Sequence, residues 1–271
     1  MKKRPTFPAQ MNFASDQAPP DVLLSATKVM TPSNQRGMDK TPKPFVPLNK
    51  PSGIGLDSKA VRQRMVEKLL AQGLDDEMVL NAMRKVERHR FVDTALVNQA
   101  YEDTSLPIGL GQTISKPNVV ARMISLLRQG RNLLITGKMN RVLEIGTGCG
   151  YQAALLAEVS KEVYSIERLK GLHDKAINNL NQLELSNVHL IFGDGMLGHP
   201  SAGPYSGIIS AAGGDTLPQA WIDQLDIGGR IVAPWAQDGS QSLLVIDKTV
   251  KGLERQILEP VHFVPLKSGI A

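Results

Sequence analysis

Short apolar runs alternate with amphipathic stretches along the second half of the chain. The runs are rich in β-branched residues, as buried parallel strands are, and several of the stretches between them have apolar residues at helical spacing. The last two runs have no helix between them. This order predicts an α/β fold: a doubly wound, mostly parallel seven-stranded sheet with helices on both faces and an antiparallel edge. The predicted strands are 142–145, 162–166, 188–193, 207–210, 229–234, 242–247 and 256–264, and the predicted helices are 152–157, 169–183 and 218–225.

The pattern before this sheet is helical. Ser58 is placed to cap a first helix, Asp75 or Asp76 to begin a second, and Pro117 to occupy the first turn of a third. Ser115 lies where it could cap that third helix, which is its expected role on spacing alone. The residues expected to face inward on the first two helices are Val61, Met65, Val66, Leu69, Val79, Met83 and Val86.

Residues 1–56 differ from the rest in composition. They hold nine of the seventeen prolines and eight Lys and Arg against three Asp, so the whole net charge of +5 resides there. We expect this basic, proline-rich tail to be disordered, because it has too few large apolar residues to join a core. It could serve as an arm for nucleic acid or a partner, or be a species-specific extension or a misplaced start codon. The formally neutral remainder is not expected to bind nucleic acid.

Composition also bears on location. No apolar run approaches the length that spans a bilayer, and Pro5 and Pro8 interrupt the place where a signal peptide needs its apolar segment. A single cysteine, Cys149, excludes an internal disulfide and fits a reducing compartment. We therefore expect a cytoplasmic protein with no membrane partner.

A glycine turn follows the first predicted strand of the sheet, at Gly146, Gly148 and Gly150. The dinucleotide fingerprint G-x-G-x-x-G would need its third glycine at position 151, which is Tyr151. The pattern that begins at Glu144, E-x-G-x-G-x-G, instead resembles motif I of the class I S-adenosylmethionine (SAM) methyltransferases.

Carboxylates end three neighbouring strands: Glu144, Glu167 and Asp194. We expect all three to face one crevice, where they would suit a cationic, hydroxyl-rich ligand and repel a pyrophosphate. Glu167, about 20 residues after the glycines, is placed to bind ribose hydroxyls; alternatively it is a solvated residue paired with Arg168. Asp194 could accept from the adenine amine or simply form the turn between its flanking glycines.

Other chemistries find little support. The segment after the fourth strand has no Asn/Asp-Pro-Pro-aromatic motif of the exocyclic amine methyltransferases. Cys149 lies inside the glycine turn and is expected to be structural. The five histidines show no metal-ligand spacing, so no metal site is predicted.

Five segments together resemble the protein-L-isoaspartate O-methyltransferases, in order and spacing, over about residues 58 to 271. The resemblance implies a Rossmann-like fold with a helical subdomain and substrate loop at 57–110 and a SAM-dependent domain at 111–271. It also implies methyl transfer from SAM, leaving S-adenosyl-L-homocysteine, to the α-carboxyl of isoaspartyl residues in damaged proteins and peptides, which are the expected partners of a monomeric enzyme. The segments are Ala100–Asp103, Gly111–Pro117, Glu144–Tyr151, Gly193–Gly195 and Phe263–Leu266.

By that resemblance Ser115 is the catalytic residue. The residues implied in cofactor binding are Gln112, Thr113, Ile114, Ser115, Gly146, Gly148, Cys149, Glu167, Asp194 and Gly195. Two departures affect the acceptor side: 213–215 is Gly-Gly-Asp where bacterial members have Pro-Pro-Glu, and His262 replaces an arginine.

The implied chemistry requires little machinery. An α-carboxylate has a pKa of about 3.3–3.7, so at neutral pH it is already the nucleophile and needs no base. Ser115 would then orient it by hydrogen bonding. Two other readings remain: a class I methyltransferase for another small-molecule or protein acceptor, and a non-catalytic SAM-binding or basic-arm scaffold, in which Ser115 would be solely a cap.

Overall fold

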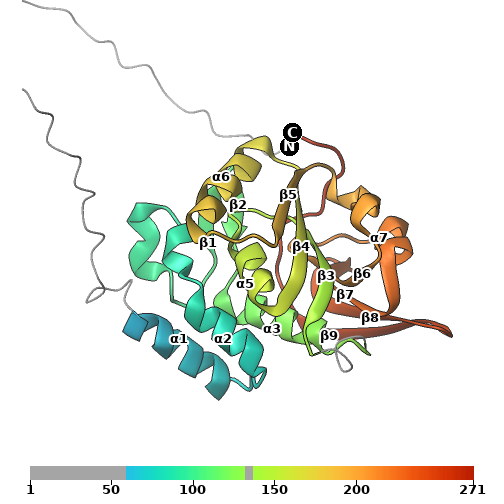
Figure 1. The fold of residues 1–271 in the computed structure, drawn as a ribbon, viewed down its shortest axis with the longest axis horizontal. Coiled ribbons are helices and arrows are strands. Elements are labelled where there is room, and N and C mark those ends of the chain that lie inside the picture. Colours follow the sequence, from blue (N-terminus) through green and yellow to red (C-terminus); the bar gives the residue numbers. More distant parts are fainter. Residues whose placement is uncertain (1–58, 132–136) are drawn as a thin grey trace, which may run out of the picture. The chain divides into compact units, whose positions relative to one another are not determined.

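The computed structural model describes residues 59–131 and 137–271 (Figure 1). The predicted cap Ser58 and the predicted disordered tail lie outside these ranges. The helices are α1 (Lys59–Ala71), α2 (Glu77–Lys85), α3 (Pro117–Arg128), α5 (Tyr151–Val159), α6 (Lys170–Leu180) and α7 (Gln219–Gln224). Short 3₁₀ turns are η1 (Arg88–Phe91), η2 (Thr94–Gln99), η3 (Asn181–Leu183), η4 (Gly195–Leu197) and η5 (Pro200–Ala202).

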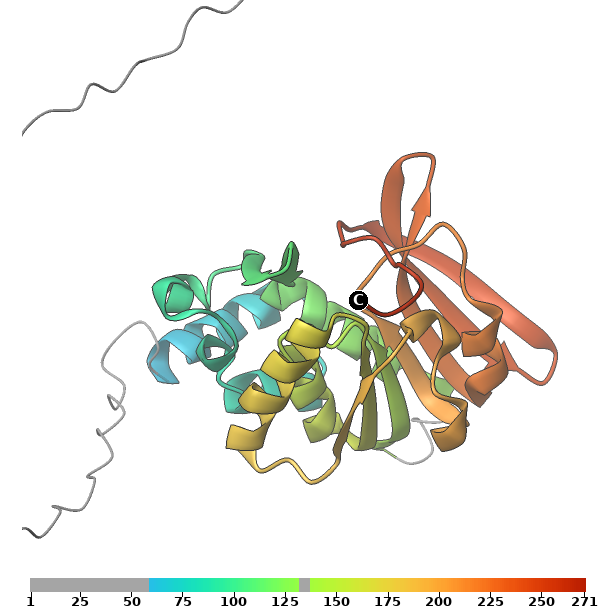
Figure 2. The ribbon, with the colours of Figure 1, turned by 90° about the horizontal axis from the view of Figure 1, so that it is seen from above.

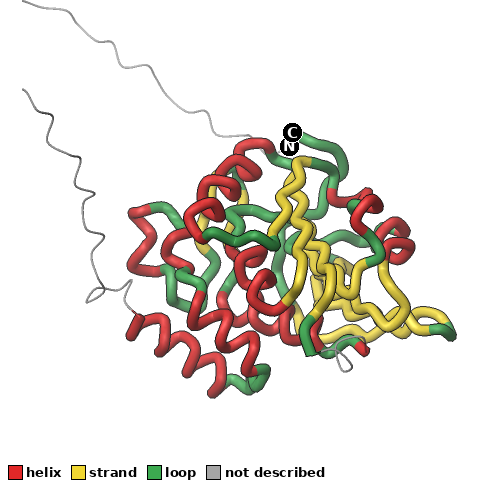
Figure 3. Tube along the Cα trace, in the orientation of Figure 1, coloured by secondary structure: helices red, strands yellow, loops and turns green. Residues whose placement is uncertain are grey.

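The predicted seven-stranded sheet is confirmed, in the order β5-β4-β3-β6-β7-β8-β9. Figure 3 draws the strands in yellow. Neighbouring strands from β5 to β7 are parallel, and β7, β8 and β9 form an antiparallel meander at the edge. The chain starts at β3, winds to β5 on one side and returns to β6 on the other. The strands are β3 (Met139–Ile145), β4 (Ser160–Glu167), β5 (Val188–Phe192), β6 (Tyr205–Ser210), β7 (Leu225–Gln237), β8 (Ser240–Thr249) and β9 (Gly252–Pro260).

Alternate residues of the central strands pack into two cores. Val142 joins the core beneath α3 and α5, whereas its neighbour Leu143 joins the opposite core with Trp221 of α7. Figure 2 shows most helices gathered on one side of the sheet and α7 on the other. Helices cover both faces, as predicted, but one layer is much thicker than the other.

The thick layer includes the N-terminal helices. Asp76 caps α2, and its carboxylate accepts from the backbone N–H groups of Met78 and Val79, at 3.1 and 3.3 Å. The predicted inward residues of α1 and α2 are buried except Val61, which is half-buried. A charged residue that the pattern did not reveal, Arg88, is fully buried here and its guanidinium lies 4.9 Å from the Tyr151 ring centroid.

Two predictions about the chain outside the helices are corrected. None of the predicted strands lies before residue 142, but Leu106–Gly109 (β1) and Gln112–Ile114 (β2) form a hairpin. Its apolar residues alternate inward over too few positions to show a period. The last strand also ends at Pro260, not at 264, because the following segment leaves the sheet and crosses toward β6, where Gly213 pairs with Pro265.

Candidate active site

A cavity of about 430 Å³ lies at the carboxyl ends of β3, β4, β5 and β6. This is the edge at which open α/β sheets bind ligands, and β3 and β6 flank the point where the strand order reverses. We call it the cofactor cavity, since its volume suits a small molecule of cofactor size. Of the predicted cofactor residues, those that line it are Gln112, Thr113, Gly146, Gly148, Glu167 and Gly195.

The glycine turn forms the floor of this cavity. Gly146, Gly148 and Gly150 all have positive φ, of 88°, 58° and 91°, a conformation that strains any residue with a side chain. A Cβ on Gly148 would come within 3.2 Å of the Ile108 side chain from the hairpin. Glycine here therefore allows both the turn and the close approach of the hairpin over it.

Glu167 is held at the cavity wall by the backbone. Its Oε2 accepts from the N–H of Gly148 and its Oε1 from the N–H of Leu169, both at 2.9 Å. Each oxygen retains a second lone pair for a ligand hydroxyl. The alternative pairing with Arg168 is not found, because the Arg168 guanidinium donates to the carbonyl of Gly269 at 2.8 Å.

Glu144 does not face the crevice, contrary to expectation. It is fully buried and accepts from the Ser165 hydroxyl, which in turn lies 2.6 Å from the Thr147 hydroxyl. Burial raises the pKa of Glu144 to about 8; the hydrogen bond from Ser165 and the nearby Gln152 amide oppose the rise, and the charge of Glu167 adds to it. The motif's acidic residue thus supports the glycine turn from beneath.

Asp194 also lies outside the cavity lining. Its two oxygens accept from the backbone N–H groups of Met196, at 2.9 Å, and Gly269, at 2.6 Å, so it holds the turn that follows β5. Its proposed contact with adenine stays a prediction. The next residue, Gly195, does line the cavity, and a Cβ there would come within 2.5 Å of the Ile145 side chain.

Cys149 and Ile114 point into the core instead of the cavity. Burial raises the pKa of the Cys149 thiol to about 11, partly offset by a hydrogen bond to the Tyr151 backbone and the charge of Arg88. An inert, protonated thiol agrees with the structural role expected of it. Contact of either residue with a cofactor would have to come from the backbone.

The C-terminal segment forms the opposite wall. The hydrophobic pattern did not predict this wall, because it placed the residues up to 264 in the last strand. Val264 to Lys267 line the cofactor cavity. The backbone of Gly213 fixes them, donating to the Val264 carbonyl at 2.9 Å and accepting from Leu266 at 2.7 Å. A Cβ on Gly213 would come within 2.9 Å of Gln241. The departure at 213–215 therefore fits a close contact of the loop with this segment.

Ser115 is not a helix cap. The cap position of α3 belongs to Lys116, whose side chain makes no capping bond, and the free N–H of Asn118 is instead bound by the Asp103 carboxylate at 3.0 Å. Ser115 is half-buried and lines a second cavity of about 270 Å³. Ser105 and His262, the residue that replaces the family's arginine, line it too. We call this the acceptor cavity.

The same two chain segments line both cavities. One contributes Gln112 and Thr113 to the cofactor cavity and Ser115 to the acceptor cavity. The other contributes Val264 to the first and Phe263 to the second. The two cavities therefore lie beside neighbouring residues of the same two segments.

Two further observations concern metal ions and membranes. In the described ranges, no three histidine, cysteine or carboxylate side chains are grouped so that they could hold a metal ion. No helix of residues 59–131 or 137–271 is long and apolar enough to cross a membrane.

Comparison with known proteins agrees with this geometry. A protein-L-isoaspartate O-methyltransferase of Methylibium petroleiphilum is 53% identical over 268 residues, 98% of this chain and 96% of the relative. One from Burkholderia thailandensis is 48% identical, over 94% of this chain and 76% of the relative. The Methylibium match takes in most of the segment before residue 57, which is therefore not specific to one species; its predicted disorder stays a prediction.

Solved structures show the same fold. A structure described as a protein-L-isoaspartate O-methyltransferase has a TM-score of 0.69 and 26% identity, over 77% of this chain and 67% of the other. A Plasmodium falciparum structure of the same description, in complex with S-adenosyl-L-homocysteine, has a TM-score of 0.64 and 26% identity, over 76% of this chain and 98% of the other. Residues 60–271 match the family model for protein-L-isoaspartate(D-aspartate) O-methyltransferases. The chain belongs to the protein-L-isoaspartate(D-aspartate) O-methyltransferase family.

Proposed function

We propose that this protein transfers the methyl group of SAM to the α-carboxyl of L-isoaspartyl residues in damaged proteins and peptides. The observation that carries the proposal is the pair of cavities joined by the segments around Ser115 and Phe263. The resulting ester would collapse to a succinimide, whose hydrolysis returns part of the product as normal aspartate.

The cofactor cavity fits SAM in the chemistry of its walls. Glu167 offers two carboxylate oxygens for ribose hydroxyls, and such charge-assisted bonds contribute about 1.5–3 kcal/mol each. Ile166, Leu169 and Leu172 supply an apolar wall suited to a purine ring. The open glycine turn lets the chain approach the ligand closely. The bound cofactor would supply a methyl group that is already activated by its sulfonium centre.

The acceptor cavity supplies position and not proton transfer. An α-carboxylate is ionised at neutral pH, so it attacks the methyl carbon directly as the bond to sulfur breaks. In our proposal the Ser115 hydroxyl donates a hydrogen bond to the carboxylate oxygen that does not attack. Lys116, exposed at the same cavity, attracts the carboxylate by charge. That cation supports acceptor binding even though His262 replaces the usual arginine.

The competing readings are weakened by particular contacts. The scaffold reading requires Ser115 to be solely a cap, and the capping bond at α3 comes from Asp103. A methyltransferase for a small acceptor requires a closed pocket, whereas the acceptor cavity shares Val119, Pro260 and Val261 with a larger groove beside it.

Methyl transfer from labelled SAM to an isoaspartyl peptide and to its normal aspartyl counterpart tests the proposal. We expect labelling of the isoaspartyl peptide alone, as a base-labile ester. Equal labelling of both peptides, or of neither, would refute it.

We also propose that the protein is a cytoplasmic monomer. The single cysteine is free and buried, which fits a reducing compartment. The large exposed apolar residues lie on different elements, for example Leu70 on α1, Leu197 on η4 and Val250 between β8 and β9. Sedimentation at micromolar concentration would test the monomer, and a dimer would contradict it.

A further inference from the structure

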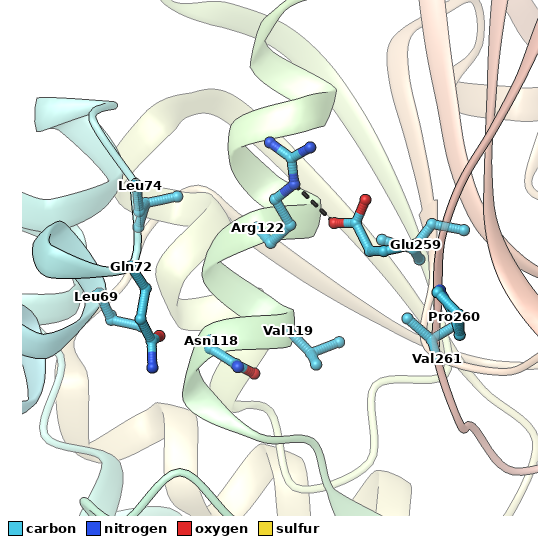
Figure 4. A pocket seen from close by; sticks show the side chains of 11 residues that line it. Leu69, Gln72, Leu74, Asn118, Val119, Arg122, Glu259, Pro260 and Val261 are labelled. Atoms are coloured by element: carbon cyan, nitrogen blue, oxygen red, sulfur yellow. Dashed lines mark hydrogen bonds and ion pairs between the residues drawn. The ribbon is translucent and has the colours of Figure 1, made fainter.

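A further cavity of about 640 Å³ is separate from the cofactor cavity (Figure 4). It is a groove between the end of α1, the outer face of α3 and the end of β9. Leu69, Leu74 and Val119 give it apolar walls. We call it the flanking groove; neither Ser115 nor any residue of the cofactor cavity lines it.

The flanking groove continues the acceptor cavity. The two share Val119 on α3 and Pro260 and Val261 at the end of β9. Along α3 and the C-terminal segment, the order is therefore cofactor cavity, acceptor cavity, flanking groove. A carboxyl group held at Ser115 belongs to a polypeptide, so the residues beside it must leave the acceptor cavity, and the groove opens directly from it.

An ion pair lies in the groove wall. The Arg122 Nε of α3 donates to the Glu259 Oε1 of β9 at 2.8 Å, and both side chains are 43% exposed (Figure 4). The bond uses only the Nε of Arg122 and one oxygen of Glu259. The guanidinium has further N–H donors, and the carboxylate, which also accepts from its own backbone N–H, has further lone pairs. The pair thus presents hydrogen-bond donors and an acceptor together, held in place by their mutual bond.

From this arrangement we infer that the flanking groove binds the main chain of the acceptor polypeptide beside its isoaspartyl residue, with Arg122 donating to a peptide carbonyl and Glu259 accepting from a peptide N–H. The inference rests on the proposed function. Main-chain contacts suit an enzyme whose substrates carry the damaged residue in many sequence contexts. Almost every flanking residue offers the same backbone N–H donor and C=O acceptor. The apolar walls add contact area without requiring one particular side chain.

The test compares peptide lengths. Arg122→Met removes the donors and keeps most of the side-chain bulk. We expect it to raise KM about five- to tenfold for isoaspartyl peptides of about ten residues. A change of this size corresponds to the loss of one or two partly solvated hydrogen bonds. KM for a capped isoaspartyl tripeptide and kcat for all peptides should stay at wild-type values. Two long peptides with unrelated flanking sequences should respond alike.

Arg131→Met is the matched control. Arg131 pairs with Glu254 of the same strand at 3.2 Å, but outside the groove, and its replacement should leave both peptide lengths unaffected. Three results for Arg122→Met would overturn the inference. They are equal KM changes for short and long peptides, an effect confined to one flanking sequence, and a changed melting temperature with unchanged KM. Failure of wild-type protein to methylate any isoaspartyl peptide would instead refute the proposed function.

Discussion

At the scale of single residues, burial separates carboxylates that look equivalent in the sequence. Glu144 and Glu167 both end a strand near the glycine turn, yet only Glu167 reaches the cofactor cavity. Spacing identifies the strand ends but does not say which side chain points beneath the turn. The roles of the two therefore had to come from their contacts, and each role makes a distinct prediction.

Glu167→Ala should weaken SAM binding by about 5- to 150-fold, the loss of one charge-assisted contact worth about 1–3 kcal/mol. The Gly148 and Leu169 N–H groups would then be solvated, so a small loss of stability should accompany the change. Titration calorimetry measures the affinity. Affinity equal to that of wild type would remove Glu167 from the cofactor site.

Glu144→Gln should alter how stability depends on pH. The folded-state pKa of about 8 lies above the ordinary value of 4.5, so the folded protein binds the extra proton between these two values. Wild-type stability should therefore fall as pH rises from about 5 to 8, and by linkage most of that fall should vanish in the glutamine variant. Glutamine can still accept from Ser165. Melting temperatures across this range that decline equally in both proteins would contradict the account.

At the scale of elements, strong periodic segments were predictable and short irregular ones were not. The seven strands and the change from parallel to antiparallel neighbours followed from short apolar runs and from the helices between them. The β1–β2 hairpin was not predicted because it is too short to show a period. Residues 261–264 were predicted to belong to the last strand because they are mostly apolar, like the strand before them. Both segments line the cavities, and their conformation depends on contacts with distant residues. The hairpin packs over Gly148, and the C-terminal segment is hydrogen-bonded to Gly213.

Asp103→Ala tests the element-level link between the loop and α3. Loss of the bond to the Asn118 N–H should cost about 0.5–2 kcal/mol of stability, as for other helix N-terminal caps. KM for peptides should also rise, because that bond fixes the loop beside Ser105 against the acceptor cavity. Asp226→Ala, an exposed change at the start of β7, serves as control. An unchanged melting temperature would show that the bond is absent in solution.

At the scale of the whole molecule, a sheet whose carboxyl ends form the cofactor cavity is combined with a helical layer that carries the acceptor side. The hairpin and α3 bring Gln112 and Ser115 over the sheet, and the C-terminal segment closes the other wall. The family and fold could be read from motifs in the sequence, whereas the continuity of the two cavities with the flanking groove required the packing of distant segments.

Deleting residues 1–56 should leave the melting temperature of the enzyme and its methylation of peptides close to wild type. The reason is composition, since this segment has few large apolar residues and carries the whole net charge of +5. Any salt-sensitive binding to nucleic acid should disappear with it. A large loss of stability in the shortened protein would show that the segment packs on the enzyme.

The central claim is that the ionised carboxylate needs no base, so the enzyme gains its rate from orienting this acceptor through Ser115. Single-turnover methyl transfer at saturating SAM and isoaspartyl peptide tests it most directly. The rate of Ser115→Ala is compared with that of Ser201→Ala, a control in η5 near the amino end of β6, away from both cavities. We predict a rate at least about tenfold lower for Ser115→Ala, equivalent to about 1.4 kcal/mol in the barrier, and an unchanged rate for the control. A Ser115→Ala rate within about twofold of wild type would contradict the account.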